Sequence, residues 1–416
     1  MLLLKNISQL VTCSNVNNFP KKGKEQNEIG LRLDSNIIVD KGRIEFIGSS
    51  KSLSKILKKK KIKITKEIDC KNKVVTPGFI DSHTHFVFAG NREDEYEMQI
   101  AGKTYQEIAA AGGGIISTVN AVRKSSFNNL YEIAERRLKK FVETGTTTIE
   151  AKSGYGLDTN NEIKILKVIN KLKEKNKFGL DIIPTFLGAH AVPKGVTKKA
   201  YIESICYEMI PKIAKENLAE FIDVFCEVNY FDAEETSMIF EQGMRFGLIP
   251  KIHTDQFNSI GGVKAALKHK AISVDHLEVL KDKDIKKLSG KNTIATLLPG
   301  VSYFLDISYQ PARKLISNNV PVTLATDFNP GSCPTQNIQT IMSLASLELK
   351  MTAEEILNAV TINAAYAVNR QNRIGSIEIG KQADLLVFDI PSYKFITYNF
   401  GVNNITNVIK KGRIIK

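Results

Sequence analysis

The histidines of this chain are few, and nearly all of them lie where a metal or a substrate could be bound. Five of the six follow or end apolar, strand-like runs, and these five are His83, His85, His190, His253 and His276. Asp327 ends another such run. Residues two apart on a strand point to the same side, so His83 and His85 face one space. A lone His-x-His pair is more often only polar, but the shared placement of these side chains predicts a metal centre.

A mixed set of nitrogen and oxygen ligands predicts catalysis rather than a structural metal. His83 and His85 from the first run would be joined by His253 and Asp327, with water in an open position. A metal held in this way lowers the pKa of its water and polarises a carbonyl group. Asp327 could also accept the proton of that water. The remaining histidines, His190 and His276, are then available to contact the substrate or stabilise an oxyanion.

The elements that must position these residues alternate between strand-like and helical patterns. The strand candidates are 74–81, 146–150, 180–187, 221–227, 249–253, 272–276, 293–298 and 320–326. Amphipathic helical patterns lie between them, at 130–144, 162–173, 199–216, 233–246 and 262–269. This order predicts an α/β fold, a parallel (β/α)8 TIM-like barrel, whose active site lies at the C-terminal ends of the strands. A doubly wound open sheet is the alternative, and the polar residues at so many strand ends argue against it.

Both ends of the chain show a different pattern. Short strand-like runs occur at 1–10, 30–33, 36–40, 43–48 and 62–75, the last with a turn near Asn72, and again at 374–380, 383–389 and 408–415, with a short helix at 51–60. We therefore expect residues 1–73 and 371–416 to form one small composite β domain. The barrel, residues 74–370, would be inserted between these two segments.

Composition favours a cytoplasmic enzyme. The chain has 416 residues, of which 43% are hydrophobic, so it can bury a large core. No apolar run approaches the roughly 20 residues of a membrane span, and the first apolar residues are too few for a signal peptide. The five cysteines are widely spaced and form no Cys-x-x-Cys motif, which argues against disulfides and cysteine zinc sites and for a reducing compartment.

The net charge of +14 bears on possible partners. The lysines are scattered along helical patterns, and the one dense run, 58–61, contains no aromatic residue. A solvated surface explains this distribution better than a nucleic-acid site does. The positive field would still favour a small anionic substrate.

Several motifs give the chain a family resemblance. The sequence PGFIDSHTH at 77–85 resembles the opening motif of the amidohydrolase superfamily, and GSIEIGKQADLLVFD at 375–389 resembles its return to a small β domain. Within that superfamily the chain resembles the imidazolonepropionase family. The stretches that carry this likeness are 85–92, 111–115, 150–157, 186–190 and 326–332. The resemblance spans almost the whole chain.

This resemblance implies hydrolysis of 4-imidazolone-5-propanoate to N-formimidoyl-L-glutamate, in histidine degradation, by a homodimer. The implied ligands of one zinc or iron ion are His83, His85, His253 and Asp327. The implied substrate-binding residues are Arg92, Tyr155, His190, Asn329, Gly331 and Ser332. The guanidinium of Arg92 is suited to the propionate group, because its planar fork can bind a carboxylate through two hydrogen bonds.

Two positions depart from simple expectations. Gln256 is the fourth residue of His253-Thr-Asp-Gln256, where some relatives are thought to use glutamate as a proton shuttle. Glutamine cannot shuttle a proton, although it can hydrogen-bond the ring, so proton transfer would depend on Asp327 and His276. Lys152 invites comparison with the carbamylated lysine that bridges two metals in many superfamily members. We favour one metal, because the resemblance is to a mononuclear family.

Other functions remain possible at this stage. A cyclic amidase or a deaminase acting on a different ring would use similar ligands, but Arg92 and Tyr155 favour the propionate substrate. A barrel that serves only as a scaffold would not need the intact ligand set. The glycines at 112–114 could form a lid over the site.

Overall fold

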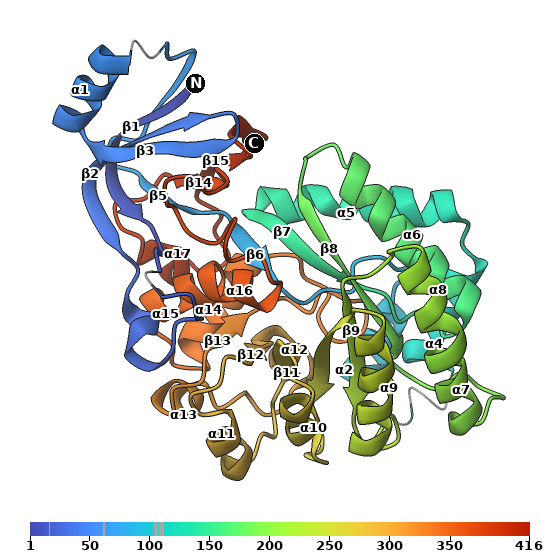
Figure 1. The fold of residues 1–416 in the computed structure, drawn as a ribbon. Helices are drawn as coiled ribbons and strands as arrows, with labels where there is room; N and C mark the ends of the chain where they lie inside the picture. The colour runs from blue at the N-terminus through green and yellow to red at the C-terminus, as the bar shows by residue number, and fades with distance from the viewer. Residues whose placement is uncertain (16, 61–62, 104–106, 108–111) are drawn as a thin grey trace.

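The fold consists of a closed barrel of parallel strands and a second, smaller sheet beside it (Figure 1). It is seen in a computed structural model, which describes all residues except 16, 61–62, 104–106 and 108–111. Each of the eight predicted barrel strands is present. They are β6 (Phe79–Asp81), β7 (Thr146–Lys152), β8 (Asp181–Ala189), β9 (Phe221–Cys226), β10 (Ile249–Thr254), β11 (Ser273–His276), β12 (Ile294–Leu297) and β13 (Val322–Leu324).

Helices surround the barrel, and all of them except α2 bury residues against the rest of the chain. Those that follow the first half of the barrel are α2 (Glu93–Ile100), α4 (Ile115–Lys124), α5 (Phe127–Glu143), α6 (Thr159–Lys175), α7 (Lys198–Ser204), α8 (Ile210–Lys215) and α9 (Ala233–Arg245). Those of the second half are α10 (Gly262–Lys268), α11 (Asp282–Leu288), α12 (Pro299–Leu305), α13 (Ala312–Ser317), α14 (Ile338–Leu347), α15 (Ala353–Ala359) and α16 (Ile362–Ala367). In the described part of the chain, no helix is long and apolar enough to cross a membrane.

The single helix expected at 199–216 is divided. A π-helical turn, Ile205–Met209, separates α7 from α8. Pro211 lies in the first turn of α8 and has no N–H to donate, so a regular α-helical bond is missing there.

The smaller sheet combines both ends of the chain. Its strands are β1 (Leu2–Val11), β2 (Leu31–Asp40), β3 (Arg43–Ser49), β4 (Lys66–Asp69), β5 (Val74–Pro77), β14 (Leu385–Phe388), β15 (Ile405–Lys410) and β16 (Arg413–Ile414). The 3-10 turn Gly23–Asn27 precedes β2, α1 (Ser50–Lys60) packs on the sheet, and α17 (Phe395–Tyr398) lies between β14 and β15. We propose that residues 1–73 and 371–416 form the small domain and 74–370 the barrel, although β5, which follows this boundary, pairs within the small sheet.

Two expected strands differ from the structure. The run 74–81 is broken at Gly78, where the side chain of Thr147 approaches so closely that any Cβ would clash; β5 therefore joins the small sheet and β6 the barrel. The run 374–380 forms no strand. Its amides donate instead to two separate segments, from Ile377 to Thr12 and from Gly380 to Ile44.

The first and last barrel strands meet just beyond their ends. The amide of Asp327 donates to the carbonyl of His83 at 3.0 Å, and the amide of His85 donates to the carbonyl of Phe328 at 3.0 Å. The carboxylate of Asp81 also crosses this seam, accepting from the amide and hydroxyl of Thr326. Barrel closure thus places strand ends that are far apart in the sequence side by side.

Candidate active site

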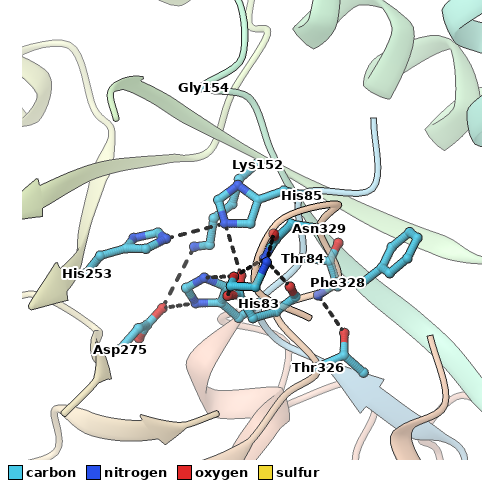
Figure 2. A network of polar contacts seen from close by, with 12 residues as sticks. His83, Thr84, His85, Lys152, Gly154, His253, Asp275, Thr326, Phe328 and Asn329 are labelled. Atoms are coloured by element: carbon cyan, nitrogen blue, oxygen red, sulfur yellow. Dashed lines mark hydrogen bonds and ion pairs between the residues drawn. The ribbon is translucent and has the colours of Figure 1, made fainter. Parts of the chain in front are cut away.

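The residues predicted to bind a metal converge at the C-terminal end of the barrel (Figure 2). His83 and His85 follow β6, His253 lies near the end of β10, and Asp327 follows β13. All four side chains are buried. Parallel strands end at the same rim of a barrel, so ligands from three strands can share one position.

The distances between these side chains fit a small cation. Oδ1 of Asp327 lies 3.4 Å from Nε2 of His83 and 3.3 Å from Nε2 of His85. Nε2 of His253 lies 3.4 Å from Nε2 of His85. Ligand atoms about 2.0–2.1 Å from a tetrahedral zinc ion are about 3.3–3.4 Å apart. His83 Nε2 and Asp327 Oδ1 have no hydrogen-bond partner among the described residues, as expected of atoms that bind a metal.

Two buried carboxylates hold the histidines from behind. Nδ1 of His83 lies 2.7 Å from Oδ2 of Asp275, and Nδ1 of His253 lies 3.0 Å from Oδ1 of Asp223. Each carboxylate accepts the Nδ1 proton and leaves the lone pair of Nε2 free for a metal. The sequence analysis did not identify either aspartate. The sequence did contain a signal for both, namely a carboxylate within an apolar strand. A buried charge needs a partner, so such a residue is expected to contact another polar group.

The charge states of Asp327 and His253 also suit a metal site. Burial alone would raise the pKa of Asp327, but the adjacent rings of His83 and His85 hold that pKa well below its ordinary value. Burial and the neighbouring His83 lower the pKa of His253, which therefore stays neutral. A permanent carboxylate and a neutral imidazole are the forms that bind metals.

A cavity opens above the ligands, and its lining contains the other predicted site residues. It is bounded by His85, Arg92, Ile115, Tyr155, His190, Phe225, Tyr230, His253, Gln256, Phe257, His276, Leu305, Asp327, Asn329, Gly331 and Ser332. Five members of this lining were not predicted: Ile115, Phe225, Tyr230, Phe257 and Leu305. Glycines 112–114 directly precede Ile115 in this wall, whereas Ala111 lies outside the described residues.

Arg92 is placed to receive an anion. Its Nε donates to the hydroxyl of Thr118 at 2.9 Å, and no carboxylate of the described chain lies within ion-pair distance of its guanidinium. A Cβ on Gly331 would lie only 2.0 Å from Nη1 of Arg92. Glycine at 331 is therefore what allows the guanidinium to lie against this loop.

The loop after β13 fixes the metal-facing aspartate. Asn329 donates to the carbonyl of Asp327 at 2.6 Å, and its own Oδ1 accepts from the amides of Gly331 and Ser332. The hydroxyl of Ser332 donates to Oδ2 of Asp327 at 3.2 Å, which leaves Oδ1 facing His83. Asn329 and Ser332 thus orient Asp327 as well as lining the cavity.

His190 and Tyr155 form one wall of the cavity. The ring of His190 stacks on His85 with a centroid separation of 5.2 Å, and the Tyr155 ring lies 5.4 Å from His190. Nδ1 of His190 donates to the carbonyl of Gly154 at 3.0 Å. Burial and the nearby His85 lower the pKa of His190 to about 3. It therefore offers the cavity a neutral ring with an accepting Nε2.

His276 has a different support. Its Nδ1 lies 3.3 Å from Oε1 of the buried Glu278, which also accepts from Nε2 of Gln310 at 2.9 Å. The backbone at His276 has a φ of 85°, which is uncommon for a residue with a side chain. This bend turns the imidazole from the strand end toward His253, whose ring centroid is 5.2 Å away. Glu278 is a further residue that the sequence analysis missed.

Lys152 is held by carboxylates beneath the ligands. Its Nζ lies 2.7 Å from Oδ2 of Asp223 and 3.0 Å from Oε1 of Glu150. These contacts use the amine as an ammonium group. This geometry therefore does not support a carbamylated Lys152 that bridges two metals.

Comparison with known proteins gives the family. The amidohydrolase family model matches residues 74–415. Imidazolonepropionase from Christiangramia forsetii is 43% identical over 417 residues, covering 100% of both chains. The imidazolonepropionase of Thermoanaerobacter pseudethanolicus is 45% identical, covering 98% of this chain and 96% of that one.

Solved structures agree on the fold at much lower identity. An adenosine deaminase from Xanthomonas campestris with bound zinc superposes with a TM-score of 0.73 at 14% identity, covering 99% of this chain and 92% of that one. Guanine deaminase from E. coli gives a TM-score of 0.73 at 15% identity, covering 100% of this chain and 99% of that one. The chain belongs to the amidohydrolase family and, within it, to the imidazolonepropionases.

Proposed function

We propose that this chain is a metal-dependent hydrolase that opens the ring of 4-imidazolone-5-propanoate. Water would be added across the ring C–N amide bond to give N-formimidoyl-L-glutamate, the third step of histidine degradation. Full-length identity of 42–45% to imidazolonepropionases supports this reaction. The observation that carries it is the single cavity that has the candidate metal ligands at its base and Arg92 in its wall.

The chemistry follows from the groups that face the cavity. A metal ion held by His83, His85, His253 and Asp327 would polarise the ring carbonyl and make water a better nucleophile. Arg92 would bind the propionate and so fix the ring in position. Tyr155 and His190 would contact the ring from the opposite wall, where His190 accepts a hydrogen bond from a ring N–H.

Proton transfer would depend on Asp327 and His276. Asp327, held by Ser332, accepts a proton from the attacking water. His276 stabilises the oxyanion that develops on the ring carbonyl. As the C–N bond breaks, the leaving nitrogen takes up one proton, so that a water molecule has been added in total. Gln256 contributes a hydrogen bond to the ring and no proton.

The remaining properties are proposed on indirect grounds. One zinc or iron ion per chain suits the imidazole and carboxylate ligands. The propionate substrate suits a net charge of +14 without a nucleic-acid partner. We further propose a homodimer located in the cytoplasm, as the family resemblance and the five free, buried cysteines suggest.

Disappearance of freshly generated 4-imidazolone-5-propanoate is the direct test. The purified protein would be assayed after loading with zinc or iron and again after chelation. We expect metal-dependent loss of substrate with matching appearance of N-formimidoyl-L-glutamate. Arg92→Lys should raise KM by about 10- to 100-fold, because a lysine gives up the two-point bond to the propionate.

The contrary result is equally clear. If the folded, metal-loaded protein leaves this compound intact, the result rules out the proposed substrate but not the metal centre. Other cyclic amides would then be assayed, and Gln256 would be the first residue to examine.

A further inference from the structure

The buried amine of Lys152 has contacts that the proposed reaction does not use. Lys152 lies at the end of β7, inside the barrel and beneath the ligand cluster (Figure 2). Its Nζ is within 2.7 Å of Asp223, 3.0 Å of Glu150 and 3.8 Å of Asp275. Burial lowers its pKa, but the neighbouring Asp223 and Glu150 outweigh burial and raise it, so the amine stays charged.

Two of these carboxylates are the ones that hold metal-facing histidines. Asp223 accepts from His253, and Asp275 accepts from His83. The ammonium of Lys152 contacts the Oδ2 atoms of both aspartates. Among the described residues, Lys152 is therefore the one group that contacts both Asp223, which supports His253, and Asp275, which supports His83.

The position of Lys152 coincides with a possible second metal site. His83, Glu150 and Asp275 bring ligand atoms within 4.8 Å of one another, close enough to surround a cation. The ammonium already contacts Glu150 and Asp275 in that group. A positive charge therefore occupies the place where another metal ion would be attracted.

The formal charges of the buried cluster agree with a single metal. Three carboxylates face the ammonium groups of Lys152 and Lys251, which leaves one negative charge, and Asp327 adds a second. One divalent ion cancels that remainder. Buried charge that is not compensated is costly, so this balance favours one ion over two.

We propose that Lys152 is a positioning residue that acts as a fixed internal cation, ordering both carboxylate–histidine pairs and keeping the centre mononuclear. This inference deepens the proposed function, because it rests on the metal centre assigned there. Without the ammonium, Asp223 and Asp275 would repel each other and Glu150 across a site closed to water. The hydrogen bonds from Nδ1 of His253 to Asp223 and from Nδ1 of His83 to Asp275 would weaken. The Nε2 atoms of the two histidines would then no longer point to one position.

Lys251 provides a matched control within the same cluster. Its Nζ is also fully buried, and it contacts Glu150 at 2.8 Å and the carbonyl of Ser82 at 3.1 Å. It has no ion pair within 4.0 Å with Asp223 or Asp275 among the described residues, although its charge still helps to lower the pKa of both carboxyls. A substitution at either lysine removes one buried cation, but only the substitution at Lys152 removes the link between the histidine supports.

The experiment compares zinc binding by Lys152→Met, Lys251→Met and the unaltered chain. Zinc would be removed and then titrated back against a chelating indicator, with bound metal counted by elemental analysis. We expect one zinc ion per unaltered chain and an affinity that falls by about 10- to 100-fold in Lys152→Met. Lys251→Met should lose clearly less zinc affinity than Lys152→Met, because it removes a buried charge but no direct contact with Asp223 or Asp275, and both metal-free variants should melt earlier.

Either of two results would overturn the proposal. Zinc affinity in Lys152→Met could equal or exceed that of the unaltered chain, or both lysine variants could lose affinity equally. If Lys152→Met does not fold, Lys152→Gln, which keeps hydrogen-bonding capacity but no charge, decides between the outcomes. Zinc titration needs no substrate, so absence of turnover in the unaltered chain would count against the proposed reaction and not against this role of Lys152.

Discussion

At the scale of single residues, His276 is distinguished by the partner behind it. The two histidines that face Asp275 and Asp223 are aligned for metal binding. His276 instead has Glu278, a carboxylate that burial makes harder to ionise, since its pKa is raised. A glutamate at this place holds the ring of His276 in its orientation toward the cavity.

Substitution of Glu278 by glutamine should therefore slow the reaction without emptying the metal site. We expect His276→Asn to lower kcat by about 100-fold or more and Glu278→Gln to lower it by about tenfold, because the ring keeps its place but loses its charged partner. Steady-state kinetics with parallel metal analysis would measure this. Asp284→Asn, which changes a buried carboxylate on α11 away from the cavity, is the control. Equal rates for Glu278→Gln and the control would remove Glu278 from this role.

At the scale of elements, the two sheets are joined by a cluster of charges at the start of β8. Asp181 is the first residue of this strand, and its carboxylate contacts Lys410 of β15 at 2.9 Å and Lys411 at 2.8 Å. Arg373 approaches the same carboxylate at 3.0 Å. Burial would raise the pKa of Asp181, but Lys410 and its neighbours hold it well below the ordinary value.

Asp181→Asn should destabilise the chain in a pH-dependent way. A carboxylate with a depressed pKa contributes stability above its unfolded pKa, near 4, and loses it as the pH falls below that value. We expect a loss of about 2 kcal/mol at pH 7 that shrinks as the pH falls below about 4. Urea denaturation at several pH values would measure it. Glu67→Gln, in an exposed ion pair with Lys5, should change stability by less than about 0.5 kcal/mol.

At the scale of the whole molecule, the proposed metal centre links distant parts of the fold. Its candidate ligands come from three strands of one barrel, and they lie where the barrel closes. A metal that binds the folded chain and not the unfolded one adds stability in proportion to its concentration over its Kd.

Removal of the metal should therefore lower the melting temperature and leave the barrel folded. Free zinc at 100 times its Kd contributes about 2.7 kcal/mol, which for a chain of this size corresponds to about 3 °C. Thermal denaturation before and after chelation, followed by readdition of zinc, would measure the shift. An unchanged melting temperature would mean that zinc does not bind the folded chain selectively.

Much of this arrangement could be predicted from the sequence, for identifiable reasons. Parallel strands buried on both faces appear as continuous apolar runs, which is why all eight barrel strands were found. Histidine is rare enough in this chain that its recurrence at strand ends was informative. Contacts between distant segments were not predictable in this way. The break at Gly78 depends on Thr147, and the irregular run at 374–380 depends on Thr12 and Ile44.

Asp223 and Asp275 were missed for a related reason, and Lys152 was considered only as a metal-bridging lysine. These three residues each belong to a different strand, and only the register of the barrel brings them together. The sequence shows a charged residue within each apolar run but does not identify its partner.

The seam between β6 and β13 has a consequence for how the protein is made. Thr326 and Asp81, which bond across it, are 245 positions apart, and Asp327 adjoins this junction. A ribosome must therefore synthesise the chain past residue 327 of 416 before the last ligand can join the first two. Until then, a nascent chain can offer a metal ion only part of its ligand set. The complete set of candidate ligands can therefore form only after the last barrel strand, β13, has been synthesised.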